Sequence, residues 1–170
     1  MKLVSVKRAF NGEDKLIPLG ESVAIIADAG ETFAKQSSHW SDRTPQLEVK
    51  FENAEGQTLT HWYNLKGYKT KADYEGQAVP KGVTFESSDN GNEMYAIKGG
   101  ARIESPEKTA ECERIVGEFL NDAGIGAGEE IEDVNDITGN QIGLMVRDGA
   151  RGFREVHYTK LASKVKAVEA

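Results

Sequence analysis

The segment HWYNLKGYKTK, residues 61–71, has the residue types best suited to binding chemistry in this sequence. It holds three aromatic side chains and three lysines, and no acidic residue. Lysine cations can neutralise phosphates, and flat aromatic rings can stack on bases that have no partner strand. The segment therefore predicts a surface that binds single-stranded nucleic acid without reading its sequence.

Strand alternation divides these side chains between two faces, because successive residues of a β-strand point to opposite sides. Trp62 and Lys66 are expected to point outward, while Tyr63 and Leu65 are expected to enter the core. Core or edge packing of Trp62 is the competing interpretation, since tryptophan is common on strands. Beyond Gly67, the basic edge continues through Tyr68, Lys69 and Lys71.

A second basic stretch, VRDGARGFR, holds three arginines around a glycine-rich turn. A guanidinium group can pair with a phosphate or stack on a base, so Arg147, Arg151 and Arg154 are expected to contact nucleic acid. A solvated turn is the competing interpretation. Trp40, in the segment HWSDRTP, is expected either to stack on a base or to cover the core from a loop.

Most of the sequence follows the two-residue period of half-buried strands. Residues 46–52 and 58–66 are predicted to form a hairpin, because the intervening NAEGQ suits a tight reversal. A second hairpin is predicted over 138–160. The other expected elements are strands at 2–10, 22–29 and 93–103, and an excursion at 70–92 that contains one short strand. Gly99 and Gly100 are expected to bend or bulge the strand that contains them.

One helix is predicted over residues 106–123. Ser105 can cap its first turn, Pro106 suits the first helical position, and Gly124 provides a left-handed stop. The expected apolar face, spaced at helical intervals, consists of Cys112, Ile115, Val116, Phe119 and Leu120.

Strands, one helix and a closing hairpin follow one another in the order of a five-stranded Greek-key barrel, the OB-fold. The sequence therefore predicts a mainly β, OB-like single domain over residues 1–162, followed by a C-terminal tail at 163–170. Other α+β meanders share this order of elements. In an OB-fold the loop between strands four and five flanks the face of strands two and three, so the two basic stretches are expected to converge on one groove.

The charges are segregated along the chain, although the 170 residues carry a formal net charge of −7. Residues 104–136 hold eleven carboxylates and two cations, whereas residues 140–166 hold six cations and two carboxylates. A polyanionic partner responds to such local fields, so the acidic total does not exclude it. The acidic helix region is expected to lie away from the binding groove.

Composition also indicates the cellular compartment. Cys112 is the only cysteine, which excludes an internal disulfide and a multi-cysteine zinc site. The first ten residues lack the apolar block of a signal peptide, and no apolar run approaches the roughly 18 residues that span a bilayer. The sequence therefore predicts a cytoplasmic protein without a membrane partner.

Two long segments carry a resemblance to a known family. WSDRTPQLEVKFENAEGQTLTHWYNLKGY resembles the central hairpin of small phage-encoded single-stranded DNA-binding proteins. The later ERIVGEFLNDAGI and DITGNQIGLMVRDGARGFREVHY are similar to their helix and closing hairpin.

The resemblance implies an OB-fold, protection of single-stranded DNA in the host cytoplasm, and partners among replication or recombination proteins. By matching position, it implies DNA contacts by Trp62, Tyr63, Lys66, Tyr68 and the segment from Arg147 to Arg154. Many such proteins end in an acidic tail, whereas this chain ends KLASKVKAVEA, which puts recruitment through the terminus in doubt.

No catalytic constellation is recognisable in the sequence. The acidic loop 129–136 departs from a calcium loop at Ile137, the three histidines have no metal-ligand spacing, and no glycine-rich phosphate loop is present. No metal or cofactor is therefore expected, and the protein is predicted not to be an enzyme. Two alternatives stay open: a protein-interaction or virion accessory domain, and a metal-dependent nuclease using Glu129, Glu130, Asp133 and Asp136.

Overall fold

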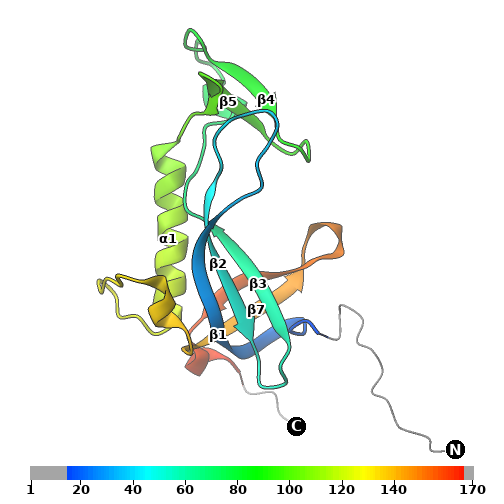
Figure 1. Ribbon diagram of the computed structural model, residues 1–170, viewed down its shortest axis with the longest axis vertical. Helices are drawn as coiled ribbons and strands as arrows, with labels where there is room; N and C mark the ends of the chain where they lie inside the picture. Colours follow the sequence, from blue (N-terminus) through cyan, green and yellow to red (C-terminus); the bar gives the residue numbers. More distant parts are fainter. Residues whose placement is uncertain (1–14, 167–170) are drawn as a thin grey trace, which may run out of the picture.

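The computed structural model describes residues 15–166, with Arg151 described by its backbone alone (Figure 1). It contains a five-stranded antiparallel sheet in the order β3-β2-β1-β7-β8 and a smaller three-stranded sheet in the order β4-β5-β6. The strand expected at residues 2–10 lies outside the described residues. Within the described part of the chain, no helix is both long and apolar enough to cross a lipid bilayer.

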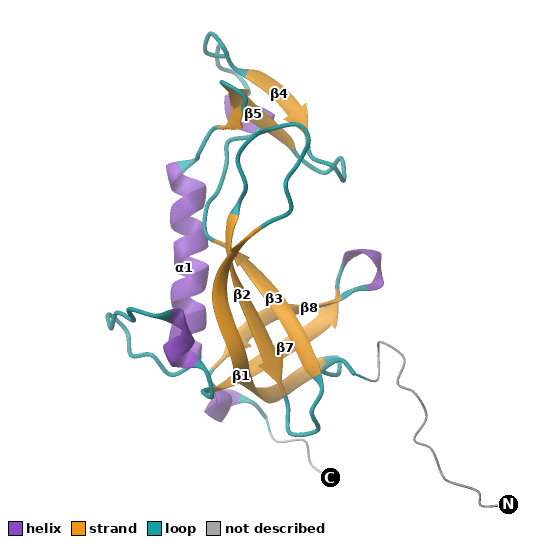
Figure 2. Cartoon of the chain, viewed as in Figure 1, coloured by secondary structure: helices purple, strands orange, loops and turns teal. Residues whose placement is uncertain are grey.

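The large sheet consists of β1 (Gly20–Phe33), β2 (Pro45–Glu52), β3 (Thr58–Asn64), β7 (Gln141–Asp148) and β8 (Arg154–Lys160). The small sheet consists of β4 (Thr84–Ser87), β5 (Met94–Lys98) and β6 (Ala101–Arg102). Short 3₁₀ turns lie at Lys71–Tyr74, Val134–Ile137, Ala150–Gly152 and Ala162–Lys164. Figure 2 shows that the small sheet lies beyond one end of the large sheet, near the start of the helix α1 (Pro106–Asp122).

The β2–β3 hairpin confirms the pattern that predicted it. Leu47, Val49 and Phe51 are buried, and the intervening residues of β2 point outward. The turn between the strands is stabilised by the Asn53 side chain, whose carbonyl oxygen accepts the backbone N–H groups of Glu55 and Gln57. The second predicted hairpin is also confirmed, as β7 and β8.

Helix α1 begins and ends close to where the sequence predicts. The Ser105 hydroxyl accepts the backbone N–H of Lys108, which satisfies a free donor of the first turn. One face of the helix packs on the sheet through Phe119, whose ring meets Phe51 edge-on at 6.2 Å between centroids. Ile115 was expected on this face but is exposed, because it lies at the margin of the contact with the sheet.

The excursion from the large sheet is longer than expected. Residues 70–92 contain a 3₁₀ turn and β4, and β4 pairs with β5 to continue directly into the small sheet. Gly99 and Gly100 both have positive φ and form the tight turn between β5 and β6, instead of a bulge within one strand. Their lack of a Cβ permits this left-handed reversal.

The expected barrel is not closed. The order of the five strands would place β3 beside β8, yet no ladder of hydrogen bonds joins these two edge strands within residues 15–166. A hollow of about 250 Å³ lies between them over α1, lined by side chains that include His61, Tyr63 and Val156. The structure is therefore mainly β with one main helix and an open five-stranded sheet.

Candidate nucleic-acid interface

The basic aromatic segment leaves the end of β3 and lines a groove of about 460 Å³ where the two sheets and α1 meet. Its contributions to the groove wall are Asn64, Lys66, Gly67, Tyr68 and Thr70. The other residues that line the groove belong to other segments of the chain: Thr44, Ala72, Asp73, Glu93, Tyr95, Arg102, Lys108 and Cys112. We call this hollow the junction groove.

Gly67 allows the segment to lie directly on the first turn of α1. Its backbone N–H donates to the Thr109 hydroxyl at 3.0 Å, and its carbonyl accepts the backbone N–H of Ser105 at 2.9 Å. A Cβ at this position would lie 2.3 Å from the Cβ of Lys108, closer than any side chain tolerates. The absence of a side chain at Gly67 thus brings the lysines that follow it alongside the helix and the small sheet.

Trp62 points outward from β3, as the strand alternation predicts, and 49% of its surface is exposed. Its indole N–H donates to the Glu48 carboxylate at 2.8 Å, across the strand pair. Asn64 follows on the same face of β3 and lines the junction groove, so the exposed indole stands at the approach to that groove. The competing interpretation is core or edge packing. A core position is wrong, whereas the place of Trp62 on β3, an edge strand of the large sheet, agrees with edge packing.

The surface around Trp62 is acidic. On the same outward face of β1 and β2, Asp28, Glu48 and Glu52 are accompanied by one cation, Lys50. An aromatic ring there can stack on a base, but this part of the face does not attract phosphates. Cations that neutralise phosphates have to come from the other side of the junction groove.

Tyr63 and Tyr68 do not belong to the exposed surface, and their burial argues against the predicted DNA contacts. Tyr63 is 7% exposed, and its ring stacks on Phe119 at 4.9 Å between centroids. Burial raises the pKa of the Tyr63 hydroxyl above its ordinary value. Tyr68 is also 7% exposed, with the Arg102 guanidinium 3.8 Å from its ring centroid. Neither ring offers a face to a base.

Arg102 organises the wall of the junction groove, although nothing in the sequence singled it out. Its side chain is 6% exposed and lies among the rings of Tyr68, Trp40 and Tyr95, the last two at 4.8 and 5.2 Å from its guanidinium carbon. The guanidinium Nε donates to the Asp42 carboxylate at 3.0 Å, and an Nη donates to the Thr44 hydroxyl at 2.8 Å. We call this arrangement the Arg102 cage.

The Arg102 cage gives Trp40 a structural role. The ring of Trp40 is half-buried, and it meets Tyr95 edge-on at 5.3 Å. Because Arg102 occupies a place over this ring, Trp40 holds the β1–β2 loop against the small sheet. Trp40 thus lies in a loop, as expected, but it packs in the Arg102 cage instead of covering the hydrophobic core of the large sheet.

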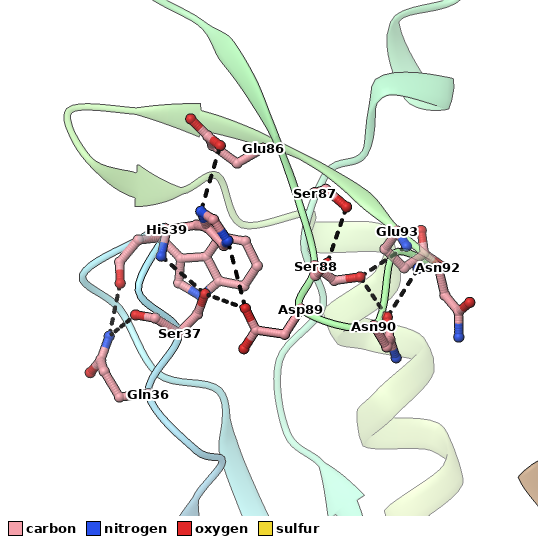
Figure 3. A network of polar contacts seen from close by, with 11 residues as sticks. Gln36, Ser37, His39, Glu86, Ser87, Ser88, Asp89, Asn90, Asn92 and Glu93 are labelled. Carbon is pink, nitrogen blue, oxygen red and sulfur yellow. Dashed lines mark hydrogen bonds and ion pairs between the residues drawn. The ribbon is translucent and has the colours of Figure 1, made fainter. Parts of the chain in front are cut away.

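A polar network beside the cage holds the same loop (Figure 3). The imidazole of His39 lies between the carboxylates of Glu86 and Asp89, at 3.9 and 3.7 Å. The Ser37 hydroxyl accepts the backbone N–H of His39 and lies 3.5 Å from Asp89. The hydroxyl thus meets the histidine backbone instead of its ring, so this serine, histidine and aspartate do not form a nucleophilic triad.

The three lysines of the segment differ in their partners. Lys66 forms an ion pair with Glu104 at 3.6 Å. Lys69 and Lys71 have no ion pair within residues 15–166, and each ammonium lies over an aromatic ring, that of Tyr74 at 5.7 Å and that of Phe85 at 6.0 Å. Lys69 and Lys71 are therefore the cations of this region best placed to bind a phosphate.

The other cations of the junction groove are already neutralised. Lys108 donates to the Asp73 carboxylate at 2.7 Å, and Arg102 is paired with Asp42. The hydrogen bond from Lys108 is the main reason that the pKa of Asp73 lies below its ordinary value. The groove itself has little net charge, and Lys69 and Lys71 lie beside it, on the segment that contributes Tyr68 and Thr70 to its wall.

The arginine turn lies at the other end of β3. Arg154 donates to the carbonyl of Ile17, whose own backbone N–H donates to the carbonyl of Thr58, the first residue of β3. Lys66 lies two residues beyond Asn64, the last residue of β3, so roughly 25 Å of extended chain separates the two basic stretches. The prediction that they converge on one groove is wrong, because the β7–β8 turn lies to the side of the large sheet, apart from the small sheet and the start of α1 (Figure 1).

The arginines themselves are only partly available. Arg147 donates to the Glu155 carboxylate at 2.8 Å across the β7–β8 pair. The side chain of Arg151 lies outside the described part of the structure. Phe153, next to this turn, is 72% exposed.

The acidic loop shows no metal site. Within residues 15–166, no three His, Cys, Asp or Glu side chains are arranged to hold a metal ion. In the 129–136 loop the Asp133 carboxylate accepts the backbone N–H of Asn135, and Glu129 accepts that of Gly126, so these groups serve the loop conformation.

Comparison with known proteins adds no relative. No protein-family model matches the sequence, and no curated protein sequence is significantly similar to it. The resemblance to phage single-stranded DNA-binding proteins therefore stays a prediction, and the function has to be argued from the junction groove and its surroundings.

Proposed function

We propose that this protein binds single-stranded DNA without sequence preference and without catalysing a reaction. The observation that carries the proposal is the half-exposed Trp62 at the approach to the junction groove, together with Lys69 and Lys71 on the segment that continues along the groove wall. Neither lysine has an ion pair within residues 15–166. Base stacking and phosphate neutralisation are the two contributions to sequence-independent binding of a single strand.

The proposed path of the strand follows the outward face of β3. A base stacks on Trp62, the backbone passes Asn64, and the phosphates approach the lysines beyond Gly67. Lys66 takes part by exchanging its exposed ion pair with Glu104 for a phosphate, which costs little because surface ion pairs are weak.

The strand order supports an OB-like fold in this proposal. The order β3-β2-β1-β7-β8, with α1 between β3 and β7 in the chain, supports the interpretation of the large sheet as an OB-fold whose last pair of strands has not closed. OB-folds bind oligonucleotides on the face of their second and third strands, where Trp62 lies. Together with the sequence resemblance, this favours a role in phage replication or recombination, with proteins of those processes as partners.

A salt-dependent titration tests the proposal. Fluorescein-labelled oligo-dT would be titrated with the protein at about 50 mM and about 200 mM salt while anisotropy and tryptophan emission are recorded. We expect quenching of Trp62 and an affinity that falls with salt, with a logarithmic slope of about −2 if three lysines each neutralise one phosphate. Failure to bind at low salt would remove the proposal.

A second candidate function is a protein-interaction or virion accessory domain. Leu19, Val23 and Ile25 expose apolar side chains near or on the outward face of β1, and such surfaces are common in protein interfaces. This candidate predicts no binding of oligo-dT at either salt concentration. The same titration therefore separates the two functions.

A further inference from the structure

A second aromatic hollow adjoins the junction groove. It measures about 280 Å³ and is lined by Lys71, Ala72, Tyr74, Glu75, Val79 and Phe85, with Lys69 over the Tyr74 ring. The rings of Tyr74 and Phe85 meet at 6.0 Å between centroids and are tilted by 62°. We call Lys69, Lys71, Tyr74, Val79 and Phe85 the lysine–aromatic patch.

The patch is not part of the buried core. Val79 is 45% exposed, and Tyr74 and Phe85 are only half-buried although both rings are large. The walls contain one carboxylate, that of Glu75, and one ammonium group, that of Lys71. The ammonium group of Lys69, over the Tyr74 ring, adds a second positive charge beside the hollow. An aromatic hollow with a cationic rim is complementary to a base that carries a phosphate.

The patch is also continuous with the path proposed above. Ala72 lines both the junction groove and this hollow, and Lys71 lies one residue from Thr70 on the groove wall. A strand that leaves Trp62 through the groove therefore meets the patch next.

We propose that the lysine–aromatic patch is a second contact for the same single strand, in which one base packs against Tyr74 and Phe85 while Lys69 and Lys71 hold its phosphates. The inference rests on the proposed function. In the free protein the two ammonium groups lie over the rings. A bound nucleotide replaces these cation–π contacts with stronger ones, because its phosphate pairs with the ammonium groups and its base stacks on a ring.

The two contacts make binding depend on the length of the strand. An oligo-dT of about 4 nucleotides is too short to reach both contacts at once, whereas one of about 16 nucleotides reaches both. Variants of the patch should therefore weaken binding of the long oligonucleotide more than binding of the short one.

The test compares three variants by anisotropy on both lengths. Lys71→Gln with Tyr74→Leu removes one cation and one ring while keeping apolar volume, Trp62→Ala removes the first contact, and Lys164→Gln, exposed in a distant 3₁₀ turn, is the control. We expect the double variant to lose at least about tenfold in affinity for the long oligonucleotide and a clearly smaller factor for the short one. Trp62→Ala should weaken both, and the control neither.

The single variant Lys71→Gln controls for the possibility that the double variant misfolds. Lys71 is exposed, and its replacement leaves Tyr74 and Phe85 in place. It should reduce the salt slope for the long oligonucleotide by about 0.7. Unchanged affinity and slope in both patch variants, with the wild type binding normally, would overturn this inference and remove Lys71 from the proposed phosphate contacts, while the binding of single-stranded DNA itself would stand. Equal losses on both lengths would also overturn it. A wild-type protein that binds neither oligonucleotide would remove the proposed function as well.

Discussion

Replacing Arg102 with methionine should destabilise the protein strongly, because the Arg102 cage joins three segments that are distant in the sequence. The side chain links the β1–β2 loop to β6 through Asp42 and Thr44, and it fills the space between Trp40, Tyr68 and Tyr95. Methionine has a similar length but no charge and no hydrogen-bond donor.

The magnitude follows from the contacts that are lost. A hydrogen bond to a charged group contributes about 1.5–3 kcal/mol, and a partly desolvated cation–π contact contributes about 1–2 kcal/mol. Methionine recovers about 1 kcal/mol of this through packing and sulfur–aromatic contacts. Asp42 keeps a quarter of its side chain exposed, so water partly replaces its lost partner. The free energy of unfolding should fall by about 2–4 kcal/mol.

Urea unfolding followed by tryptophan fluorescence and far-ultraviolet circular dichroism measures this change. With a slope of about 2 kcal/mol per molar urea, the midpoint for Arg102→Met should fall by about 1–2 M. Arg102→Lys keeps the charge but loses the planar guanidinium group, so its urea midpoint should lie between those of Arg102→Met and the wild type.

Arg114→Met is the matched control for this experiment. Arg114 forms ion pairs with Glu111 and Glu118 on the exposed side of α1, and hydrogen bonding to Glu111 is the main cause of its raised pKa. Solvent screens such pairs, so the midpoint should hardly move. Equal midpoints for Arg102→Met and Arg114→Met would refute the reasoning, because burial of the guanidinium would then make no difference.

Three further predictions concern other parts of the molecule. Trp62→Ala should weaken oligo-dT binding by about 1–3 kcal/mol in an anisotropy titration, while the urea midpoint stays close to that of the wild type because the ring is half-exposed. Gly67→Ala should lower the free energy of unfolding by about 1–3 kcal/mol, because the new Cβ would collide with Lys108. Gly117→Ala, on the open surface of α1, should raise it by about 0.5–1 kcal/mol. Thermal unfolding measures both changes. Burial lowers the pKa of His61 below its ordinary 6.5, more than nearby Glu155 raises it, so below about pH 6.5 the unfolded chain binds a proton that the folded protein does not. The free energy of unfolding should therefore decrease as the pH falls below 6.5, and His61→Gln should flatten that decrease.

Each of these predictions has an outcome that contradicts it. Trp62→Ala with full affinity would remove stacking from the proposed function, and a large loss of stability would indicate that the ring serves the fold. Similar melting temperatures for Gly67→Ala and Gly117→Ala would show that the contact with Lys108 relaxes freely. An identical pH profile for His61→Gln and the wild type would assign the acid sensitivity to other groups.

Local patterns in the sequence were sufficient for most of the secondary structure. Three features depend on residues close together in the chain: the alternation over Leu47 to Phe51, the turn from Asn53 to Gly56, and the capped helix from Pro106. Such signals act over one strand or one helical turn, so they can be read without a fold. The same alternation correctly placed Trp62 outward and Tyr63 inward.

The pattern failed where the chain leaves the strand. Tyr68 follows Gly67, at which the chain passes onto α1 and then along the small sheet, so the two-residue period no longer says which way its ring points. The Tyr68 ring is covered by the side chain of Arg102, which belongs to β6. No count along the sequence relates the two.

Residue types and local spacing were enough to locate the two hairpins, the helix and the exposed indole, because hydrogen bonding and alternation within one element impose them. The packing of elements against one another decided the rest: the open edge between β3 and β8, the pairing of Arg102 with Asp42 sixty residues away, and the separation of the arginine turn from the lysines. These features arise from contacts between segments that are distant in the chain, and the strength of such contacts depends on burial, which exists only once the chain has folded.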